Sequence, residues 1–430
     1  MIKRILTIFI VLFSINLVAQ RSNSSPYSFF GIGEEFKPQT VEQASMGGIG
    51  VAYKSAFRLN FINPATNADL RVATYSLGGL SNNLTIQDNS NKQKSNSTSL
   101  SYISLGLPVG QKAGLSVGIQ PISSVGYSLL NSNDLNNDGV DDRTSFNGTG
   151  GASRIYGSFG IKITKDISVG IEGSYIFGNL ENNITTQVDG VDRGTKNQEL
   201  TQIRGGIVKF GVLYEKTLKD NLRLTFGSVF KLSNKFNATG TDRTFSVKIT
   251  PSGIEIPKET LSEKSISEKI TNPLQTILGV GLGKTNIWFV GVDYEFQQAF
   301  QNPNLNLNSN SGYSYGDSNR LSIGGFYIPK SNSISSYWDR VTYRAGFRFE
   351  KTGLLVNNTT VLNNFTEIND FGMSFGLSLP LNNQLSNINL GLEYGQRGTL
   401  DNNLIKENYF NFRLSLSLND VNWFKKRKID

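Results

Sequence analysis

The side chains most clearly arranged for chemistry lie in one run of nine residues, Asp-Leu-Asn-Asn-Asp-Gly-Val-Asp-Asp. Asp134, Asn136, Asp138 and Asp142 fall at positions 1, 3, 5 and 9 of a calcium-binding loop, and the sixth residue is the glycine such loops need for their turn. Position 12 is Ser145 instead of a bidentate glutamate, which predicts weak binding. We expect either a calcium ion in an extracellular loop or an acidic turn that closes without metal. No other cofactor is expected.

Two residue types on which many catalytic sites depend are missing, because the chain contains no His and no Cys. Their absence excludes disulfides, thiolate or imidazole metal sites, and both Ser/His/Asp and Cys/His catalytic sets. The carboxylates Asp293 and Glu295 form a pair, but residues two apart in a strand are neighbours by geometry alone. We therefore expect a protein that is not an enzyme.

The charge of the chain gives no reason to expect a nucleic-acid partner. The formal net charge is +8. Lys3 and Arg4 near the start and a basic tail in residues 425–430 account for much of this excess. The rest of the chain is close to balance, so the high isoelectric point does not indicate a basic binding face.

The first nineteen residues have the form of a signal peptide. Lys3 and Arg4 precede an apolar stretch that ends at the small residue Ala19, where cleavage is expected. The alternative is a membrane anchor helix, which needs about 20 apolar residues, and Ser14 and Asn16 interrupt this stretch. We expect export of the protein and removal of residues 1–19.

The rest of the chain is dominated by stretches in which apolar and polar residues alternate. Near the C-terminus Phe410 and Phe412 lie on one face of a predicted strand, and Asn411 and Arg413 lie on the other. Residues 341–350 alternate in the same way. With 44 glycines and only 18% charged residues, the pattern predicts an all-β protein, a transmembrane antiparallel β-barrel of about 14 strands.

The predicted strands are separated by connections of two kinds. Short turns are expected at residues 110–113, 164–166, 217–220 and 284–286, and long polar loops at residues 81–94, 123–150, 179–199, 233–271, 299–317 and 351–368. Outer-membrane barrels have short periplasmic turns and long extracellular loops. A soluble β-sandwich shows the same period-two pattern but has no reason to sort its loops by length. The sorting favours a barrel in the cell outer membrane.

Several charged residues fall on the face predicted to line the lumen. They include Arg223, Glu295, Arg344, Arg348 and Arg413, together with Glu172, Lys209, Asp293 and Glu393. These side chains could bind the carboxylate head group of a ligand. The alternative, which we favour, is a structural network that holds a plug in the lumen.

The sequence divides into four segments. Residues 1–19 are the predicted signal peptide, 20–70 an N-terminal extension, 71–418 the barrel and 419–430 a basic C-terminal tail. The extension contains Phe29, Phe30, Ile32 and Phe36 and is too apolar for a solvated periplasmic tail. We expect it to fold into the lumen as a plug.

Within the extension, Ala44-Ser45-Met46-Gly47-Gly48-Ile49-Gly50-Val51-Ala52 and the plug motif Asn63, Pro64 and Ala65 resemble the N-terminal signature of FadL-type outer-membrane transporters. The opening Ser25-Pro26-Tyr27-Ser28 and the closing Trp423-Phe424 resemble variants found in Bacteroidota. The resemblance implies a plugged barrel of fourteen strands that admits hydrophobic compounds and releases them sideways through its wall. Thr66 departs from the family pattern, in which glycine is usual.

The sequence therefore leads us to expect passive uptake of small hydrophobic, fatty-acid-like compounds. The alternative is a non-transporting accessory or structural subunit of an outer-membrane secretion or protein-assembly complex. The expected partners are outer-membrane lipid, the barrel-assembly machinery during insertion, and either a hydrophobic small molecule or an envelope protein complex.

Overall fold

The computed structural model describes residues 25–133, 142–188, 190–250, 254–300, 312–357, 364–381 and 385–421. The predicted signal peptide lies outside these residues, as do three of the predicted calcium ligands, Asp134, Asn136 and Asp138, and nearly all of the basic tail.

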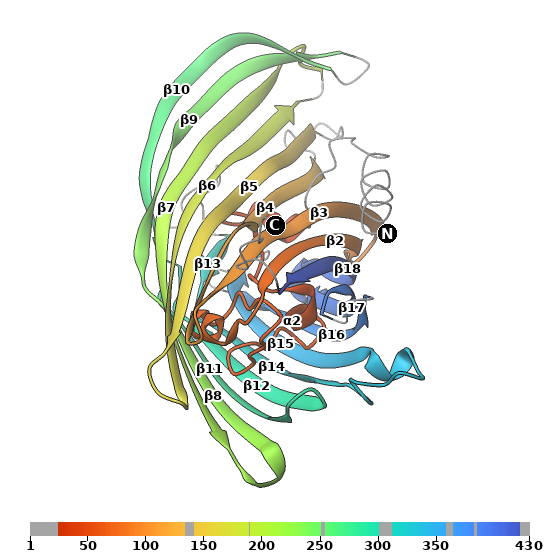
Figure 1. The fold of residues 1–430 in the computed structure, drawn as a ribbon. Coiled ribbons are helices and arrows are strands. Elements are labelled where there is room, and N and C mark those ends of the chain that lie inside the picture. The colour runs from red at the N-terminus through yellow and green to blue at the C-terminus, as the bar shows by residue number, and fades with distance from the viewer. Residues whose placement is uncertain are drawn as a thin grey trace, which may run out of the picture.

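A closed antiparallel β-barrel of 14 strands forms the body of the molecule (Figure 1), which confirms the predicted fold class. Neighbouring strands in the wall follow chain order, and β18 pairs with β2 to close the barrel. β8 and β9 are successive parts of one barrel strand, since both pair with β7, and β10 and β11 form the next strand in the same way. The strands are β1 (Glu34–Glu35), β2 (Ala73–Gln87), β3 (Lys92–Val109), β4 (Ala113–Asn133), β5 (Asp142–Lys162), β6 (Ile167–Gln187), β7 (Gly194–Thr217), β8 (Leu222–Lys231), β9 (Asn234–Ile249), β10 (Glu255–Asn272), β11 (Gln275–Lys284), β12 (Trp288–Gln297), β13 (Tyr313–Tyr315), β14 (Ser318–Tyr327), β15 (Thr342–Val356), β16 (Thr366–Pro380), β17 (Asn387–Gly398) and β18 (Lys406–Asp420).

Among the described residues, helical structure is confined to short turns. These are η1 (Pro26–Phe29), α2 (Val41–Ala44), η2 (Pro64–Asp69), η3 (Lys219–Asn221), η4 (Trp338–Arg340) and η5 (Asp401–Asn403). In the part of the chain that the structure describes, no helix has both the length and the apolar character needed to cross a membrane.

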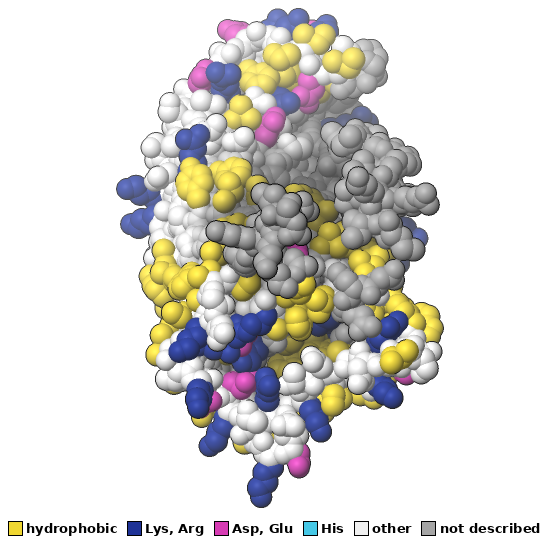
Figure 2. All heavy atoms as spheres, viewed as in Figure 1, with side chains coloured by type: hydrophobic (Ala, Val, Ile, Leu, Met, Phe, Trp, Pro, Cys, Tyr) yellow, Lys and Arg dark blue, Asp and Glu magenta, His cyan; other side chains and the backbone are white. Residues whose placement is uncertain are grey.

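The two faces of the wall have the chemistry that the alternation predicts. In β18, Phe410 and Phe412 point outward and are 44% and 40% exposed, whereas Asn411 points inward and is 7% exposed. Hydrophobic side chains are visible over the middle of the outer surface in Figure 2, while Lys and Arg gather at the end that carries the short turns. Exposed lysines such as Lys112, Lys165 and Lys219 occupy these turns.

The predicted long loops are largely wrong, because most of their residues continue the strands. Residues 123–133, 142–150, 179–187, 194–199 and 234–249 are all strand. β12 and β14 have 10 residues each, enough to span about 25 Å at the tilt of membrane barrels. β5, β6 and β7 have 21, 21 and 24 residues and rise to roughly twice that height. One side of the wall therefore stands well above the other (Figure 1).

We call this raised part the upper sheet; it consists of β9, β10 and the outer parts of β4, β5, β6 and β7. Its inner face carries a buried apolar cluster that includes Val125, Tyr127 and Phe236, whereas most of β10 is exposed on both faces and lacks the apolar alternation by which the lower strands are recognised. At one side it separates from β3, since the β3–β4 pairing ends at Ile103 and Ile119. At the other side, within the described residues, β10 pairs only with β9.

Residues 25–72, which we call the lumen segment, lie inside the barrel and contact its inner face all the way round. Tyr27 donates a hydrogen bond to the carbonyl of Ile405 before β18, and β1 pairs with β4 through Glu34 and Glu35. Further along, α2 packs on β16, β17 and β18, and η2 packs on β3, β4, β5, β6 and β7. These contacts place residues 25–72 against the inner face of the wall; that the segment acts as a plug stays a prediction.

Candidate functional site

The Asn-Pro-Ala motif fixes the lumen segment to the wall at η2. The Asn63 side chain accepts a hydrogen bond from the Ala65 amide at 3.0 Å, which caps the helix N-terminus. The same side chain donates to the carbonyls of Val51 at 2.8 Å and Val212 of β7 at 3.1 Å. Pro64 occupies the first helical position, where its lack of an N–H carries no penalty. Each residue of the motif thus has a structural task.

Replacement of Asn63 tests this arrangement. Asn63→Ala removes the cap and both donated bonds and is expected to cost about 2 kcal/mol of stability. Asn63→Asp keeps the accepting oxygen for Ala65 but loses the donor, so it should fall between the alanine variant and the native protein in urea denaturation. Equal midpoints for all three proteins would show that Asn63 does not hold the segment.

Inward-facing glycines of the wall form the seat for the lumen segment. Gly114, Gly160, Gly170 and Gly211 are paired in series across β4, β5, β6 and β7. A Cβ atom added at any of them would lie under 3.0 Å from residues 63–68 of the lumen segment, closer than real Cβ atoms come. Glycine is the residue that permits such close backbone approach.

The same contact continues on the opposite wall. A Cβ atom added at Gly324 of β14 or Gly346 of β15 would lie under 3.0 Å from the backbone of Met46 or Gly47. One added at Gly376 of β16 would lie under 3.0 Å from the side chain of Ser45. We call the glycines of the two walls the glycine ring. At Gly114, Gly160, Gly170, Gly324 and Gly346 the contact is with the backbone of the lumen segment, and at Gly211 and Gly376 it is with side chains of that segment.

Above this seat lies a cavity of about 380 Å³ with two kinds of lining. Its apolar lining comes from the outer part of the lumen segment and the raised wall, and includes Phe30, Ile32, Phe36, Ile207, Phe236 and Ile270. Its charged lining includes Lys37, Arg320, Glu295, Glu350, Arg348 and Asp370.

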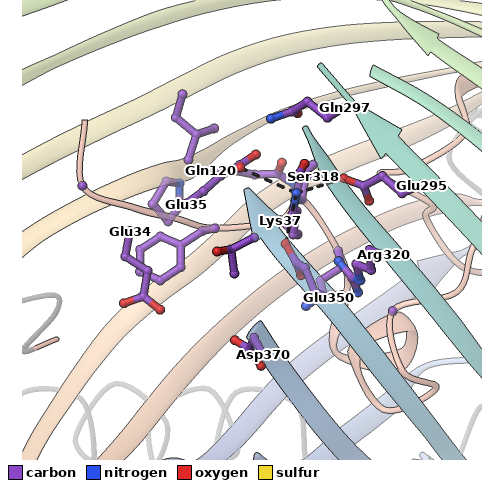
Figure 3. Close-up of a pocket in the computed structure, with 18 of the residues that line it drawn as sticks. Glu34, Glu35, Lys37, Gln120, Glu295, Gln297, Ser318, Arg320, Glu350 and Asp370 are labelled. Carbon is purple, nitrogen blue, oxygen red and sulfur yellow. Dashed lines mark hydrogen bonds and ion pairs between the residues drawn. The ribbon is translucent and has the colours of Figure 1, made fainter. Parts of the chain in front are cut away.

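Lys37 of the lumen segment stands at the centre of the charged lining (Figure 3). Its ammonium lies 2.9 Å from Glu295 of β12, 3.6 Å from Glu35 and 3.8 Å from Glu350 of β15. Burial opposes the charged form of Lys37, but Glu295, Glu35 and Glu350 together outweigh this effect and raise its pKa. Lys37 therefore remains charged and joins the lumen segment to two strands.

A second network lies on the adjoining strands. Arg348 of β15 contacts Glu393 at 3.0 Å, Asp370 at 3.2 Å and Glu350 at 3.5 Å. Glu393 also pairs with Arg413 of β18 at 2.5 Å. This network lies within the wall and touches the one around Lys37 through Glu350.

Charged side chains join the lumen segment to the wall at further positions, among them the ion pairs of Lys54 with Glu215 of β7 at 3.1 Å and of Asp69 with Lys162 of β5 at 2.6 Å. Arg397 of β17 bonds Glu34 of the lumen segment at 2.7 Å. Across the lumen, Lys209 of β7 pairs with Glu172 at 3.0 Å and donates to the carbonyl of Phe61 at 2.8 Å. The charges thus bind the segment to opposite sides of the barrel.

Seven of the nine charged residues predicted to face the lumen line the cavity: Glu172, Lys209, Asp293, Glu295, Arg348, Glu393 and Arg413. Arg344 is buried away from its lining and donates to Ser378 at 2.5 Å. Arg223 does not line it either: it stands at the β7–β8 turn, with a side chain 42% exposed and 3.5 Å from Glu215. Alternation predicts the face on which a residue lies but not its depth along the barrel.

Sequence reasoning missed Lys37 and Arg397 as the residues that join the segment to the wall. Alternation places Arg397 on the inner face beside the predicted Glu393 in the same way, but Lys37 lies in a segment without periodicity. Of the predicted calcium ligands only Asp142 is described. The described residues contain no group of three His, Cys, Asp or Glu side chains that could hold a metal ion.

Solved structures with the same architecture are FadL-type barrels. The Pseudomonas putida toluene transporter TodX matches with a TM-score of 0.56 and 15% identity over 90% of this chain and 99% of its own. The Ralstonia pickettii toluene transporter TbuX matches at 0.55 and 15%, over 90% and 98%. A Pseudomonas aeruginosa FadL homologue matches at 0.54 and 12%, over 90% and 98%. None of the three is described as an enzyme.

These likenesses establish a FadL-like fold, as the N-terminal motif implied. A closed barrel whose outer face carries exposed apolar side chains such as Phe410 and Phe412 belongs in the outer membrane. No curated protein matches the chain in sequence. The model of one family, BamG, matches the whole chain, residues 1–430. The chain belongs to the BamG family.

Proposed function

We propose that this protein is a closed, non-transporting accessory subunit of an outer-membrane protein-assembly complex. The name BamG associates its family with the barrel-assembly machinery. The observation that carries the proposal is the seating of the lumen segment, which glycine contacts and ion pairs fix to opposite walls. A segment held in this way acts as a permanent plug, so the barrel serves as a scaffold in the membrane.

The wall offers a further argument for closure. A sideways exit needs a gap between strands, and β3 and β4 do stop pairing beyond Ile103 and Ile119. At that point β1 pairs with β4, with Glu34 opposite Ser124 and Glu35 opposite Ser123, and the Phe36 amide donates to the carbonyl of Ile122 at 2.8 Å. The lumen segment therefore occupies the place where an opening would form.

Passive uptake of a hydrophobic compound is the second candidate. The apolar lining of the cavity favours it, as does the likeness to proteins named as toluene transporters. Proteoliposomes that contain the purified chain, with TodX as the positive control, separate the two functions. We expect toluene to enter these proteoliposomes no faster than it enters empty liposomes. A rate of entry near that of liposomes with TodX would contradict closure and support uptake.

Loss of an assembly subunit should be visible in the cell. Depletion of this chain is expected to lower the amounts of other outer-membrane barrels, because their insertion slows, while outer-membrane lipoproteins stay constant. Quantitative mass spectrometry of outer membranes provides the measurement. Unchanged barrel levels, together with slower growth on a hydrophobic carbon source, would support uptake instead.

A further inference from the structure

β10 offers an unpaired strand edge outside the membrane. Its residues Ser262 to Asn272 pair in unbroken register with Thr244 to Asn234 of β9. On its other side no strand of the described chain pairs with it, although β11, which follows in the same barrel strand, is covered by β12. Exposed N–H and C=O groups on such an edge are a template for an added strand.

Proteins usually protect a long unpaired strand edge against pairing with other chains, and the outer third of β10 is protected in this way. Pro257 has no N–H to donate, and the register shifts on both sides of Thr260. From Ser262 onward β10 contains no proline and no shift. Protection therefore stops where the regular edge begins.

The charges along the regular edge are ordered. Glu263 and Lys264 precede Ile266, and Glu268 and Lys269 follow it. All four charged side chains are exposed. Lys264, Glu268 and Lys269 form no ion pair within the described chain, and Glu263 pairs only with Arg243, at 2.9 Å on the outer face. The facing residues of β9 match only the first two charges, since Arg243 lies opposite Glu263 and Asp242 opposite Lys264, whereas Glu268 and Lys269 lie opposite the uncharged Ala238 and Asn237.

An antiparallel strand centred opposite Ile266 meets these four charges in a fixed sequence. Such a strand needs a basic residue opposite each glutamate and an acidic residue opposite each lysine, because directly opposed charges of opposite sign stabilise a pair of strands. The segment Glu-Lys-Ser-Ile-Ser-Glu-Lys is its own complement in this register, since residue 263 meets 269 and residue 264 meets 268.

We propose that the β10 edge binds an extended strand of a different envelope protein, added antiparallel, with charges that complement Glu263, Lys264, Glu268 and Lys269. A second copy of this chain has the complementary charges, but it could not pair in this way while both barrels lie in the membrane in the same orientation. An antiparallel pair is related by a two-fold axis perpendicular to its sheet, and the upper sheet continues the wall upright (Figure 1). That axis lies in the membrane plane and would turn the second barrel upside down.

This proposal deepens the proposed function, on which it rests for the existence of a partner, but the edge can be tested alone. A labelled peptide of residues 260–272 is a suitable probe, because a free peptide has no membrane orientation and carries the complementary charges. We expect it to bind the full-length protein in detergent with saturable fluorescence anisotropy.

Charge exchange tests the register. The variant with Lys264→Glu and Lys269→Glu turns two of the four opposed pairs into like charges and should bind the peptide about tenfold more weakly. A peptide in which residues 263 and 268 are lysine should recover that binding. The control, Lys216→Glu with Lys219→Glu, makes the same charge change at exposed sites on the opposite rim and should bind as the native protein does.

Backbone methylation tests strand addition itself. Two further peptides carry N-methyl groups at either the even or the odd positions, and only one of these sets faces the edge. We expect one peptide to lose binding and the other to keep it. Absence of saturable binding, equal behaviour of the two methylated peptides, or no effect of charge exchange would each overturn the proposal. Peptide binding without a co-purifying complex would instead contradict the proposed function and leave the edge intact.

Discussion

Gly170→Ala is expected to lower the free energy of unfolding by about 1–3 kcal/mol or more, the range for inserting a methyl group into a packed site. The new Cβ would lie under 3.0 Å from the backbone of Pro64 and Ala65. Both sides of this contact are backbone, one in β6 and the other in η2, so no side chain can move away. Either the lumen segment leaves its seat or the strand distorts.

The same strand provides the control. Gly173 lies three residues further along β6, and a Cβ there would meet nothing within 4 Å. Gly173→Ala removes the same backbone freedom without a clash and should leave stability unchanged or slightly higher. Urea titration, followed by the mobility of the folded barrel on unheated gels, gives both values. Equal midpoints for the two variants would contradict the tight seat.

Arg348→Met is expected to destabilise the barrel by about 3–5 kcal/mol, the usual cost of removing one partner from a buried ion-paired group. Arg348 is the positive centre for Asp370, Glu393 and Glu350. Methionine fills a similar volume, so the loss reflects unpaired carboxylates more than an empty cavity.

An exposed ion pair three residues away supplies the comparison. Lys351 lies 3.2 Å from Glu367, and their side chains are 48% and 34% exposed. Lys351→Met should cost about 0–1 kcal/mol, because solvent screens such pairs. The midpoint of urea unfolding checks both variants. If both lose the same small amount of stability, the inner network is not structural.

The membrane-embedded strands could be predicted from the sequence because one face of each strand contacts lipid and the other faces the lumen. Phe410 and Phe412 face lipid while Asn411 faces the lumen, so every second residue is selected for opposite polarity. Most of β10 (Glu255–Asn272) is exposed on both faces, and only Ile270 and Asn272 at its inner end are buried. Without a difference between its faces, its alternation disappears, and it reads as a polar loop.

The site could be predicted in outline only. The Asn-Pro-Ala motif is local, so it marks η2 directly. Its seat is not local: Gly114, Gly160, Gly170 and Gly211 come from four strands, and only their register brings them together. The same holds for Lys37, whose partner Glu295 is 258 residues away. The period-two pattern predicts the face of the strand on which a residue lies. Its depth along the barrel axis depends on the tilt and register of the strands, which the sequence pattern does not give.

Affinity purification of the tagged, full-length chain from its native outer membrane in mild detergent tests the central claim most directly. Mass spectrometry identifies both the co-purifying proteins and the bound lipids. A closed accessory subunit predicts a stoichiometric set that includes the central barrel-assembly subunit, in the same ratio for the native protein and for the Gly173→Ala control. A lone barrel that carries a fatty acid or another apolar molecule in its cavity would contradict the account.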